Sequence, residues 1–364
     1  MGAVVRLADL RRYAIARSLF APRDLQHAID RLGFVQADPI RAPARAQDLA
    51  LRHRVEGYRA GDLDRSYPTL AVEEDVFVNY GFVSRELSAL MHPRTGSHRW
   101  SDARRRRARA VLAFIAERGE THPRDVEARF AHGAVVNAWG GSSNATTHLL
   151  DAMHYRGLLR VARREAGIRV YAVRSRPHAH PSTPRARLDA LIDILVAKYA
   201  PLPAATLSPI VRRLRYAAPQ LARGIDDALV RVKRRLAHTR VDGVDWYWPA
   251  NESPIALAGT LDGEARLLAP FDPIVWDRVR FERFFGWPYR FEAYTPPAKR
   301  NLGYYALPLL YADEVIGWAN VTTKDGALES EVGYVSGRAP RGRAFARALD
   351  DELSRLRRFL APRT

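Results

Sequence analysis

The distribution of apolar residues at the start of the chain predicts two helices. Apolar positions recur at the helical period over residues 7–20 and again over residues 23–32. Gly33 follows the second segment, and glycine commonly ends a helix because it adopts a left-handed backbone at little cost. We therefore expect a pair of helices that stops at Gly33.

The octapeptide GFVQADPI, residues 33–40, interrupts this pattern with two polar side chains. The chain between its glycine and its proline is too short for a helix, and the proline biases the preceding residue toward an extended backbone. Alternate side chains of an extended segment point to opposite sides. Gln36 and Asp38 should therefore face one surface together, while Val35 and Ala37 face the other.

Two later segments have the order of a winged helix-turn-helix, in which three helices precede a two-stranded hairpin. The first predicts helices over residues 103–118, from Pro123, and over about 142–156, then strands over 158–163 and 168–173. The second predicts helices over residues 188–199, 208–215 and 225–236, then strands over 239–241 and 244–248. Asp242-Gly243, between the last two strands, is a strong hairpin signal.

Short apolar and aromatic runs separated by turn residues follow from about residue 255 and predict a small antiparallel sheet or barrel. A terminal helix over residues 343–360 closes this segment. We interpret four aromatic residues here as core: Trp276, Trp287, Tyr304 and Tyr305. The expected strands are 265–268, 289–293, 303–311, 315–321 and 328–335.

The predicted fold class is therefore α+β, with tandem winged helix-turn-helix units and a C-terminal antiparallel β-sheet or barrel. The predicted domains are residues 1–100, which carry the Gln-Ala-Asp sequence, two winged-helix units at 101–182 and 183–254, and a C-terminal domain at 255–364.

Net charge narrows the range of partners. The 364 residues include 58 Lys plus Arg and 40 Asp plus Glu, which gives a net charge of +18. Only four of the basic residues are Lys, so 54 are Arg, and guanidinium groups suit phosphate and guanine contacts. Double-stranded DNA is the expected partner, although charge alone also allows RNA or an anionic membrane surface.

Composition also excludes several kinds of site. The chain has no cysteine, which removes disulfides, iron–sulfur clusters and thiolate zinc sites. No run approaches the roughly 18 apolar residues that a membrane span needs, and no secretory signal is recognisable. We expect a cytoplasmic monomer without metal or cofactor.

The basic and short polar residues of the two winged segments are candidate DNA contacts. They gather at the start of the first helix, at the start of the third helix, on the first wing and on the last helix of the second segment. Solvated surface charge is the alternative interpretation of each cluster. The candidates are Arg104, Arg105, Arg107, Ser143, Asn144, Thr147, Arg163, Arg164, Arg231, Lys233, Arg234 and Arg235.

Gln36 and Asp38 have two alternative interpretations. An Asp before Pro often forms a turn, and a neighbouring Gln often satisfies a backbone group. A carboxylate and an amide side by side on a rigid segment are also suited to hold and polarise a water molecule, as a hydrolase requires.

The chain resembles the YcaQ/AlkZ family of bacterial DNA glycosylases, which unhook interstrand crosslinks. The resemblance rests on Gln36-Ala37-Asp38, on the tandem winged helices and on LLAPFDPIVWDRVRFERFFGWPYRFEAYTPPAKRNLGYYALPLLYADEVIG, residues 267–317. The family has a catalytic Gln-aliphatic-Gln or Gln-aliphatic-Asp motif. The resemblance therefore implies catalytic roles for Gln36 and Asp38.

The family's chemistry implies a monofunctional glycosylase for N7-alkylated purines. Such a base carries positive charge and leaves without an acid, so the protein chiefly stabilises an oxocarbenium-like sugar and delivers water. We assign these roles to Asp38 and the positioning of water or sugar to Gln36. No Lys lies near the motif in the sequence, which argues against a Schiff base. Residues expected to line the pocket are His53, Tyr58, Arg59 and Tyr80.

A non-enzymatic winged-helix protein, either a transcriptional regulator or a damage sensor, is the alternative function. Regulators usually dimerise to match two half-sites, and we find no heptad pattern for a dimer helix. This difference favours the enzyme.

Overall fold

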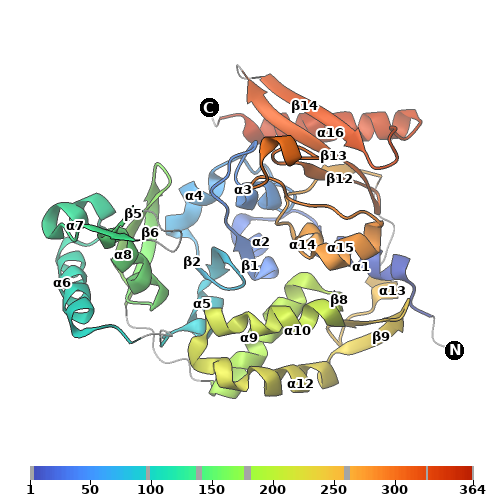
Figure 1. Ribbon diagram of the computed structural model, residues 1–364. Helices are drawn as coiled ribbons and strands as arrows, with labels where there is room; N and C mark the ends of the chain where they lie inside the picture. The colour runs from blue at the N-terminus through green and yellow to red at the C-terminus, as the bar shows by residue number, and fades with distance from the viewer. Residues whose placement is uncertain are drawn as a thin grey trace. The chain divides into compact units, whose positions relative to one another are not determined.

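Helices and antiparallel sheets alternate along the chain in the computed structural model (Figure 1). The structure describes residues 4–95, 99–136, 142–175, 182–257, 263–324 and 327–362. Contacts divide the chain into two units. The first unit comprises Met1–Leu63, Ile192–Val211 and Leu229–Thr364, and the second comprises Asp64–Leu191 and Arg212–Ala228. None of the described helices is long and apolar enough to cross a bilayer.

The first unit begins with the predicted helical pair. Helix α1 spans Leu7–Ser18, α2 spans Leu25–Leu32, and the extended strand β1 (Phe34–Gln36) follows. The α2 N-terminus is capped by Asp24, whose carboxylate accepts a hydrogen bond from the His27 backbone N–H at 2.9 Å. Short helices α3 (Ala46–Leu51) and α4 (Asp62–Ser66) come next. The two helices are confirmed, and the extended segment is confirmed as a strand from Phe34 to Gln36.

Gly33 is required where α2 turns into β1. Its φ is +66°, and a Cβ atom there would lie 2.6 Å from Cγ2 of Ile194 in helix α9 (Pro184–Tyr199). A side chain at this position would therefore be strained and would also push α9 away. Close packing at Gly33 fixes the point at which the strand that carries Gln36 begins.

The second predicted helical group is present with one correction. Helices α9, α10 (Ala204–Arg212) and α12 (Ile225–Arg235) precede the hairpin of β9 (Ala237–Val241) and β10 (Val244–Trp248). The single helix expected over 208–215 is wrong, because α10 begins and ends earlier and is followed by α11 (Leu214–Ala217) and a 3-10 turn, η2 (Pro219–Gly224). Strand β10 also pairs with β8 (Leu202–Pro203).

Four antiparallel strands form the C-terminal sheet, in the order β11-β12-β13-β14. They are β11 (Ala265–Leu267), β12 (Leu307–Tyr311), β13 (Glu314–Lys324) and β14 (Ala327–Tyr334). Within the described residues this sheet is open and is not a closed barrel. Helix α16 (Arg343–Leu360) lies along it in the red part of Figure 1. Its buried Glu352 accepts a hydrogen bond from the Leu267 backbone N–H at 2.7 Å.

The segment between β11 and β12 differs from the prediction. It holds short helices rather than a strand, namely α14 (Pro273–Trp276), α15 (Arg278–Phe285) and the 3-10 turn η3 (Pro297–Lys299), and another short helix, α13 (Pro254–Leu257), precedes β11. The strand expected over 289–293 is wrong. Tyr289, Glu292 and Ala293 are buried there, and the Tyr289 hydroxyl donates to the Ala306 carbonyl at 2.8 Å. Tyr304 is exposed, so its assignment to the core is also wrong, whereas Trp287 and Tyr305 are buried.

A buried ion pair joins two segments of the first unit that lie 218 positions apart in the sequence. Arg54 donates to both carboxylate oxygens of Asp272, at 2.8 and 3.1 Å, and neither side chain has exposed surface. Arg54 also donates to the carbonyls of Ser18, which ends α1, and Ala50 in α3. Asp272 caps α14 through the Ile274 backbone N–H at 3.1 Å. This pair therefore fixes α14 against α1 and α3.

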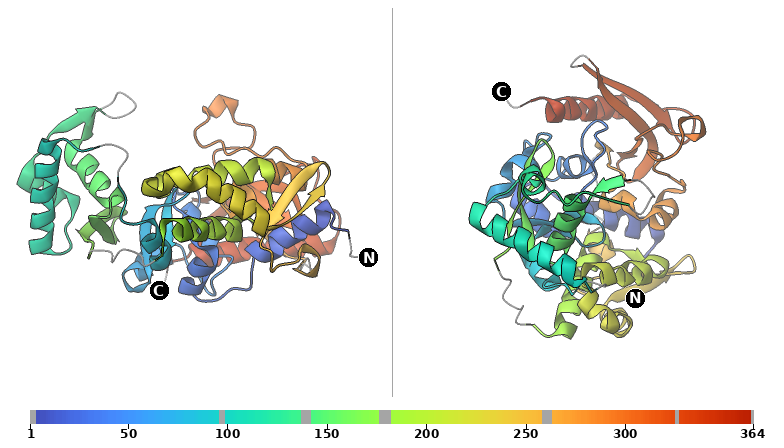
Figure 2. Two further views of the ribbon diagram at one scale, coloured as in Figure 1. Left: turned by 90° about the horizontal axis from the view of Figure 1, so that it is seen from below. Right: turned by 60° about the vertical axis from the view of Figure 1, so that its left-hand side comes forward.

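The second unit contains the first predicted group of three helices and a hairpin. Helices α6 (Asp102–Arg118), α7 (Pro123–Phe130) and α8 (Ala145–Tyr155) lie together in the teal and green part of the chain (Figures 1 and 2). The hairpin consists of β6 (Leu159–Glu165) and β7 (Ile168–Val173). The expected start of the third helix is corrected, because Ser142–Asn144 forms strand β5, which pairs with β4 (Ala134–Val136).

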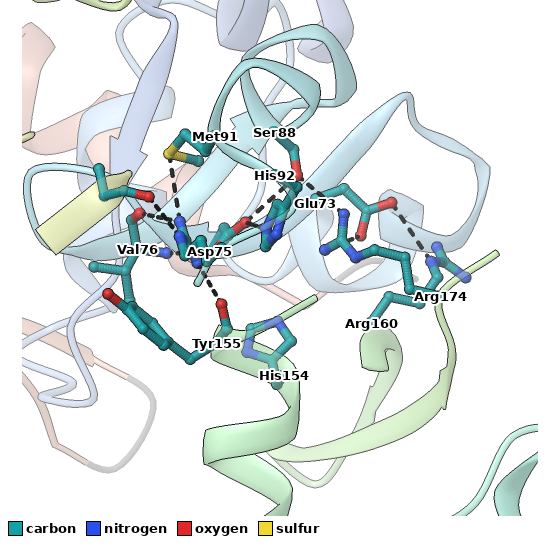
Figure 3. Close-up of polar contacts among 12 residues, drawn as sticks. Glu73, Asp75, Val76, Ser88, Met91, His92, His154, Tyr155, Arg160 and Arg174 are labelled. Atoms are coloured by element: carbon teal, nitrogen blue, oxygen red, sulfur yellow. Dashed lines mark hydrogen bonds and ion pairs between the residues drawn. The ribbon is translucent and has the colours of Figure 1, made fainter. Parts of the chain in front are cut away.

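The other hairpin of this unit carries a buried cluster of charges (Figure 3). It consists of β2 (Val72–Val76) and β3 (Tyr80–Ser84), followed by α5 (Arg85–Met91), and the 3-10 turn η1 (Tyr67–Thr69) precedes it. Asp75 in β2 contacts the His92 ring at 2.8 Å and the Arg94 guanidinium at 2.6 Å. Burial alone would raise the pKa of Asp75, but the Arg94 guanidinium and the hydrogen bond with His92 hold it well below its ordinary value. Sequence analysis did not identify this cluster, although three acids in an apolar run, AVEEDVFV, were its signal.

The role of Gly33 can be separated from the general cost of a left-handed residue. We expect Gly33→Ala to lower the free energy of unfolding by more than the roughly 1–2 kcal/mol that a left-handed conformation costs an L-residue, because it also clashes with Ile194. Gly57→Ala is the matched control, since Gly57 has φ +60° and a Cβ atom there would meet no described residue within 4 Å beyond its chain neighbours. Urea unfolding measures both variants. Equal losses would contradict close packing at Gly33.

Candidate functional site

Gln36 ends strand β1 and is held by a residue from the far end of the chain. The indole Nε1–H of Trp276, the last residue of α14, donates to Oε1 of Gln36 at 3.1 Å. The Trp276 ring in turn lies 4.8 Å from the Tyr199 ring, centroid to centroid. The orientation of the Gln36 amide is therefore set by packing between α14 and the end of α9.

Asp38 follows two residues later and is half-buried. Its Oδ1 accepts a hydrogen bond from the Ile40 backbone N–H at 2.9 Å, and its own N–H donates to Oε1 of Gln47 at 3.3 Å. One carboxylate oxygen of Asp38 thus forms the expected turn. No described residue hydrogen-bonds the other oxygen, Oδ2. Burial raises the pKa of Asp38 from its ordinary value, and the Ile40 N–H opposes this rise.

Two tyrosines lie near this carboxylate. The pKa values of Tyr294 and Tyr305 are raised, first by burial and then by the negative charge of Asp38, which places both phenols near it. Tyr294 is 77% exposed, whereas Tyr305 is buried and its hydroxyl has no hydrogen-bond partner among the described residues. The Phe291 ring contacts both phenols, at centroid distances of 6.0 and 5.1 Å.

A lysine that is remote in sequence contacts the strand of the motif. Lys198 in α9 donates from Nζ to the carbonyl of Phe34, two residues before Gln36. Burial lowers its pKa to about 7. No Lys lies near Gln36 and Asp38 in the sequence, but Lys198 lies near them in the structure. Nothing in the local pattern signals a contact across 164 positions.

Three of the four residues expected to line the pocket share one cavity. His53, Tyr58 and Arg59 line a space of about 310 Å³ in the first unit, together with Arg52 and Arg355. Burial lowers the pKa of His53, whose Nε2 lies 3.0 Å from the Leu267 carbonyl. The Tyr58 hydroxyl donates to Asp48 at 2.7 Å. The role of this cavity in substrate binding stays a prediction.

Tyr80, the fourth of these residues, belongs to the second unit. It lies in β3, and its hydroxyl donates to Glu74 at 2.7 Å. Glu74 also binds Arg164 of β6 at 2.7 Å. Both Tyr80 and Arg164 are thus engaged by a fully buried carboxylate. Arg163 is paired with Glu120 at 2.7 Å and with Glu165.

The remaining candidates of the second unit gather around the start of α8. Arg104 and Arg107 line a cavity of about 380 Å³ with His132 and His148. Asn144 caps α8 by accepting from the Thr147 N–H at 2.9 Å. Arg105 pairs with Asp102, and the side chain of Ser143 lies outside the described part of the structure. Two of the predicted arginines, Arg104 and Arg107, therefore line the same cavity. Their contact with DNA stays a prediction.

The four basic residues of α12 lie in the first unit. Arg235 is paired with Asp193 at 2.6 Å, and Lys233 lies 5.8 Å from the Tyr247 ring centroid. Arg234 is exposed and has no ion pair within the described ranges. Arg231 is partly buried. Of these four residues, Arg234 is the most available to an anionic partner.

No group of three or more metal-ligating side chains occurs among the residues that the structure describes.

Comparison with known proteins identifies the class. The DNA glycosylase AlkZ-like family matches residues 29–359. The structure of Streptomyces sahachiroi DNA glycosylase AlkZ is similar, with a TM-score of 0.62 and 14% sequence identity over 98% of this chain and 97% of that chain. At this identity the likeness shows a shared fold. The protein is thus of the DNA glycosylase class, whose substrate is DNA. Specifically, the chain belongs to the AlkZ-like family of DNA glycosylases.

The raised pKa of Asp38 predicts how its replacement affects stability. Because the folded state disfavours the ionised form, Asp38 contributes stability below the unfolded-state pKa of about 3.9 and loses it as pH rises through the higher folded-state pKa. Asp38→Asn keeps an oxygen for the Ile40 N–H and removes the charge. We expect its melting temperature at pH 7.5 to equal or exceed that of the wild type. A clear loss of melting temperature at that pH would show instead that the folded state favours the ionised carboxylate.

Proposed function

We propose that Gln36 and Asp38 form the hydrolytic centre of a monofunctional glycosylase that releases N7-alkylated purines from DNA, including purines in interstrand crosslinks. The observation that carries this proposal is the half-buried Asp38 carboxylate, which has one oxygen engaged in a turn and one without a hydrogen bond from any described residue. The free oxygen is suited to accept a proton from water and to face a cationic sugar.

The chemistry of the lesion matches this arrangement. An N7-alkylated purine is already positively charged, so its glycosidic bond breaks without protonation of the base. The developing oxocarbenium ion is stabilised by a nearby carboxylate, and a water molecule then attacks the anomeric carbon and gives up a proton. Partial burial strengthens the attraction between Asp38 and the sugar cation.

In this proposal, Gln36 positions the attacking water or the sugar. Because the Trp276 indole donates to the Gln36 oxygen at 3.1 Å, the amide NH₂ is the end turned away from the indole. That group donates hydrogen bonds. We assign it the task of holding the oxygen of the attacking water or of the sugar, within reach of Asp38.

The exposed aromatic residues support a cationic and bulky substrate. Tyr294 and Tyr304 are 77% and 44% exposed, and a phenol face attracts a positively charged base through a cation–π contact. A crosslinked base remains tethered to the opposite strand and does not swing fully out of the duplex. An exposed rim near Asp38 suits such a substrate better than a sealed pocket.

The position of Lys198 supports hydrolysis rather than a Schiff-base mechanism. Its pKa of about 7 would favour a nucleophilic amine, but its side chain is buried and its Nζ donates to the Phe34 carbonyl. We therefore propose that the product is an intact abasic site.

Activity of Asp38→Asn tests the central assignment. We expect base release from duplex DNA containing N7-methylguanine to fall at least about a hundredfold, in the range that general base catalysis contributes. Binding to undamaged duplex should not weaken, because the substitution removes one negative charge and no positive charge. Equal release by the variant and the wild type would remove Asp38 from the mechanism. A duplex with a nitrogen-mustard crosslink, assayed in parallel, tests unhooking.

Trp276→Phe tests whether the indole N–H orients Gln36. Phenylalanine keeps a ring against Tyr199 but removes the donor to Gln36, whose orientation then becomes less defined. We expect about a tenfold loss of kcat, in line with a lost hydrogen bond of roughly 1 kcal/mol or more, with KM nearly unchanged. Trp287→Phe, a buried tryptophan that stacks on Trp318, is the matched control. Equal effects of the two substitutions would indicate general packing damage instead.

A further inference from the structure

A second cavity in the first unit is lined by cations that the proposed mechanism does not use. It measures about 370 Å³ and is bounded by residues of α1, α2 and α9 and by the segment before α13. Its polar lining includes Arg17, Arg31, Lys198 and Glu252. Three cationic side chains and one carboxylate leave this space with an excess of positive charge.

The single carboxylate does not neutralise the other two cations. Glu252 accepts hydrogen bonds from the Tyr13 hydroxyl at 2.5 Å and from two nitrogens of Arg17 at 2.6 and 2.7 Å. Its oxygens are therefore committed to one wall of the cavity. Arg31 and Lys198 form no ion pair with any residue that the structure describes.

The buried amine has only neutral groups in direct contact. Lys198 is 6% exposed, donates to the Phe34 carbonyl, and lies between the rings of Phe34 and Tyr199 at 5.5 and 5.3 Å from their centroids. Burying an ammonium without a counter-ion is costly. A protein gains by placing an anion beside such a group.

The surroundings of Arg31 also indicate an excess of positive charge at this cavity. Its guanidinium carbon lies 4.4 Å from the Phe20 ring centroid. Burial and repulsion by Arg17 and Arg23 lower its pKa, although Glu252 opposes this fall. Arg31 is thus close enough to two other arginines to be repelled by them, and an anion in the cavity would relieve that repulsion.

We propose that this cavity is a binding site for a phosphate group, held by Arg31 and Lys198. A guanidinium binds phosphate oxygens through two parallel hydrogen bonds, and an ammonium adds a compact positive charge. Two basic groups that form no direct ion pair with a described residue match a dianion in charge, which favours phosphate over a carboxylate. The phosphate comes either from the DNA backbone or from a small phosphorylated molecule.

The site is linked to the motif through the backbone. Lys198 binds the carbonyl of Phe34, and Phe34 begins the strand that ends at Gln36. A bound anion stabilises the protonated amine and thereby strengthens its hydrogen bond to this carbonyl. Phosphate binding therefore steadies the strand that carries Gln36, without contact between the anion and the reacting atoms.

Calorimetric titration of the full-length protein with inorganic phosphate, at constant ionic strength in sodium chloride, tests the proposal. We expect one site per chain, with affinity at least about tenfold weaker in Arg31→Gln and in Lys198→Met. Arg31 is a surface-exposed helical residue, so its variant tests the site even if Lys198→Met unfolds. Arg347→Gln, an exposed arginine of α16, is the control and should bind as the wild type does.

Titration with sulfate supplies a readout that non-specific ion binding would not give. Sulfate shares the shape and charge of phosphate but does not titrate near neutral pH. Its binding at pH 7.5 should be accompanied by proton uptake in the wild type, measured as a dependence of the binding heat on the buffer, and this uptake should be absent in Lys198→Met. Absence of saturable binding, or equal binding by Arg31→Gln and the wild type, would overturn the proposal.

Binding to undamaged duplex distinguishes the two sources of the phosphate group. If the site holds a backbone phosphate, inorganic phosphate will weaken duplex binding beyond the effect of matched sodium chloride in the wild type, and Arg31→Gln will abolish this competition. If the duplex and phosphate bind together without competition, the site serves a small phosphorylated molecule. Both outcomes are independent of base release, so they remain interpretable even if Asp38 is not catalytic.

Discussion

The arrangement of the candidate site depends on the buried ion pair between Arg54 and Asp272. Neither side chain is exposed, so each charge requires the other, and removal of one partner from such a pair typically costs about 3–5 kcal/mol. The pair fixes the beginning of α14, whose last residue is Trp276, and Trp276 orients Gln36. A charge interaction that takes no part in chemistry thus determines where the amide of the motif points.

The second unit uses its charges in a similar way. Glu73, Glu74 and Asp75 are consecutive and buried, and they bind arginines from β6 and from the chain after α5. Several arginines of this strongly basic chain therefore serve the fold. The number of arginines available to an anionic partner is therefore smaller than the composition suggests, and Arg234 is one that lacks an acidic partner among the described residues.

The two functional proposals share one structural element, the strand β1. Its C-terminal end carries Gln36 and leads into Asp38, while the carbonyl of its first residue is held by Lys198. The proposed hydrolysis requires a carboxylate that is partly shielded and an amide that is fixed. Asp38 is half-buried, and packing of α14 against the end of α9 orients Gln36. The phosphate site would add a ligand-dependent contribution to the same strand.

The sequence by itself determined the features that depend on neighbouring residues. Periodicity located α1, α2, α6 and α16, Asp242-Gly243 located a hairpin, and the bracket of Gly33 and Pro39 located the extended motif, because caps, turns and backbone preferences act over a few positions. Tertiary structure alone decided the contact of Trp276 with Gln36 across 240 positions, the approach of Lys198 and the loss of a strand at 289–293. These depend on which distant surfaces pack together, and burial of a shared core overrides local pattern there.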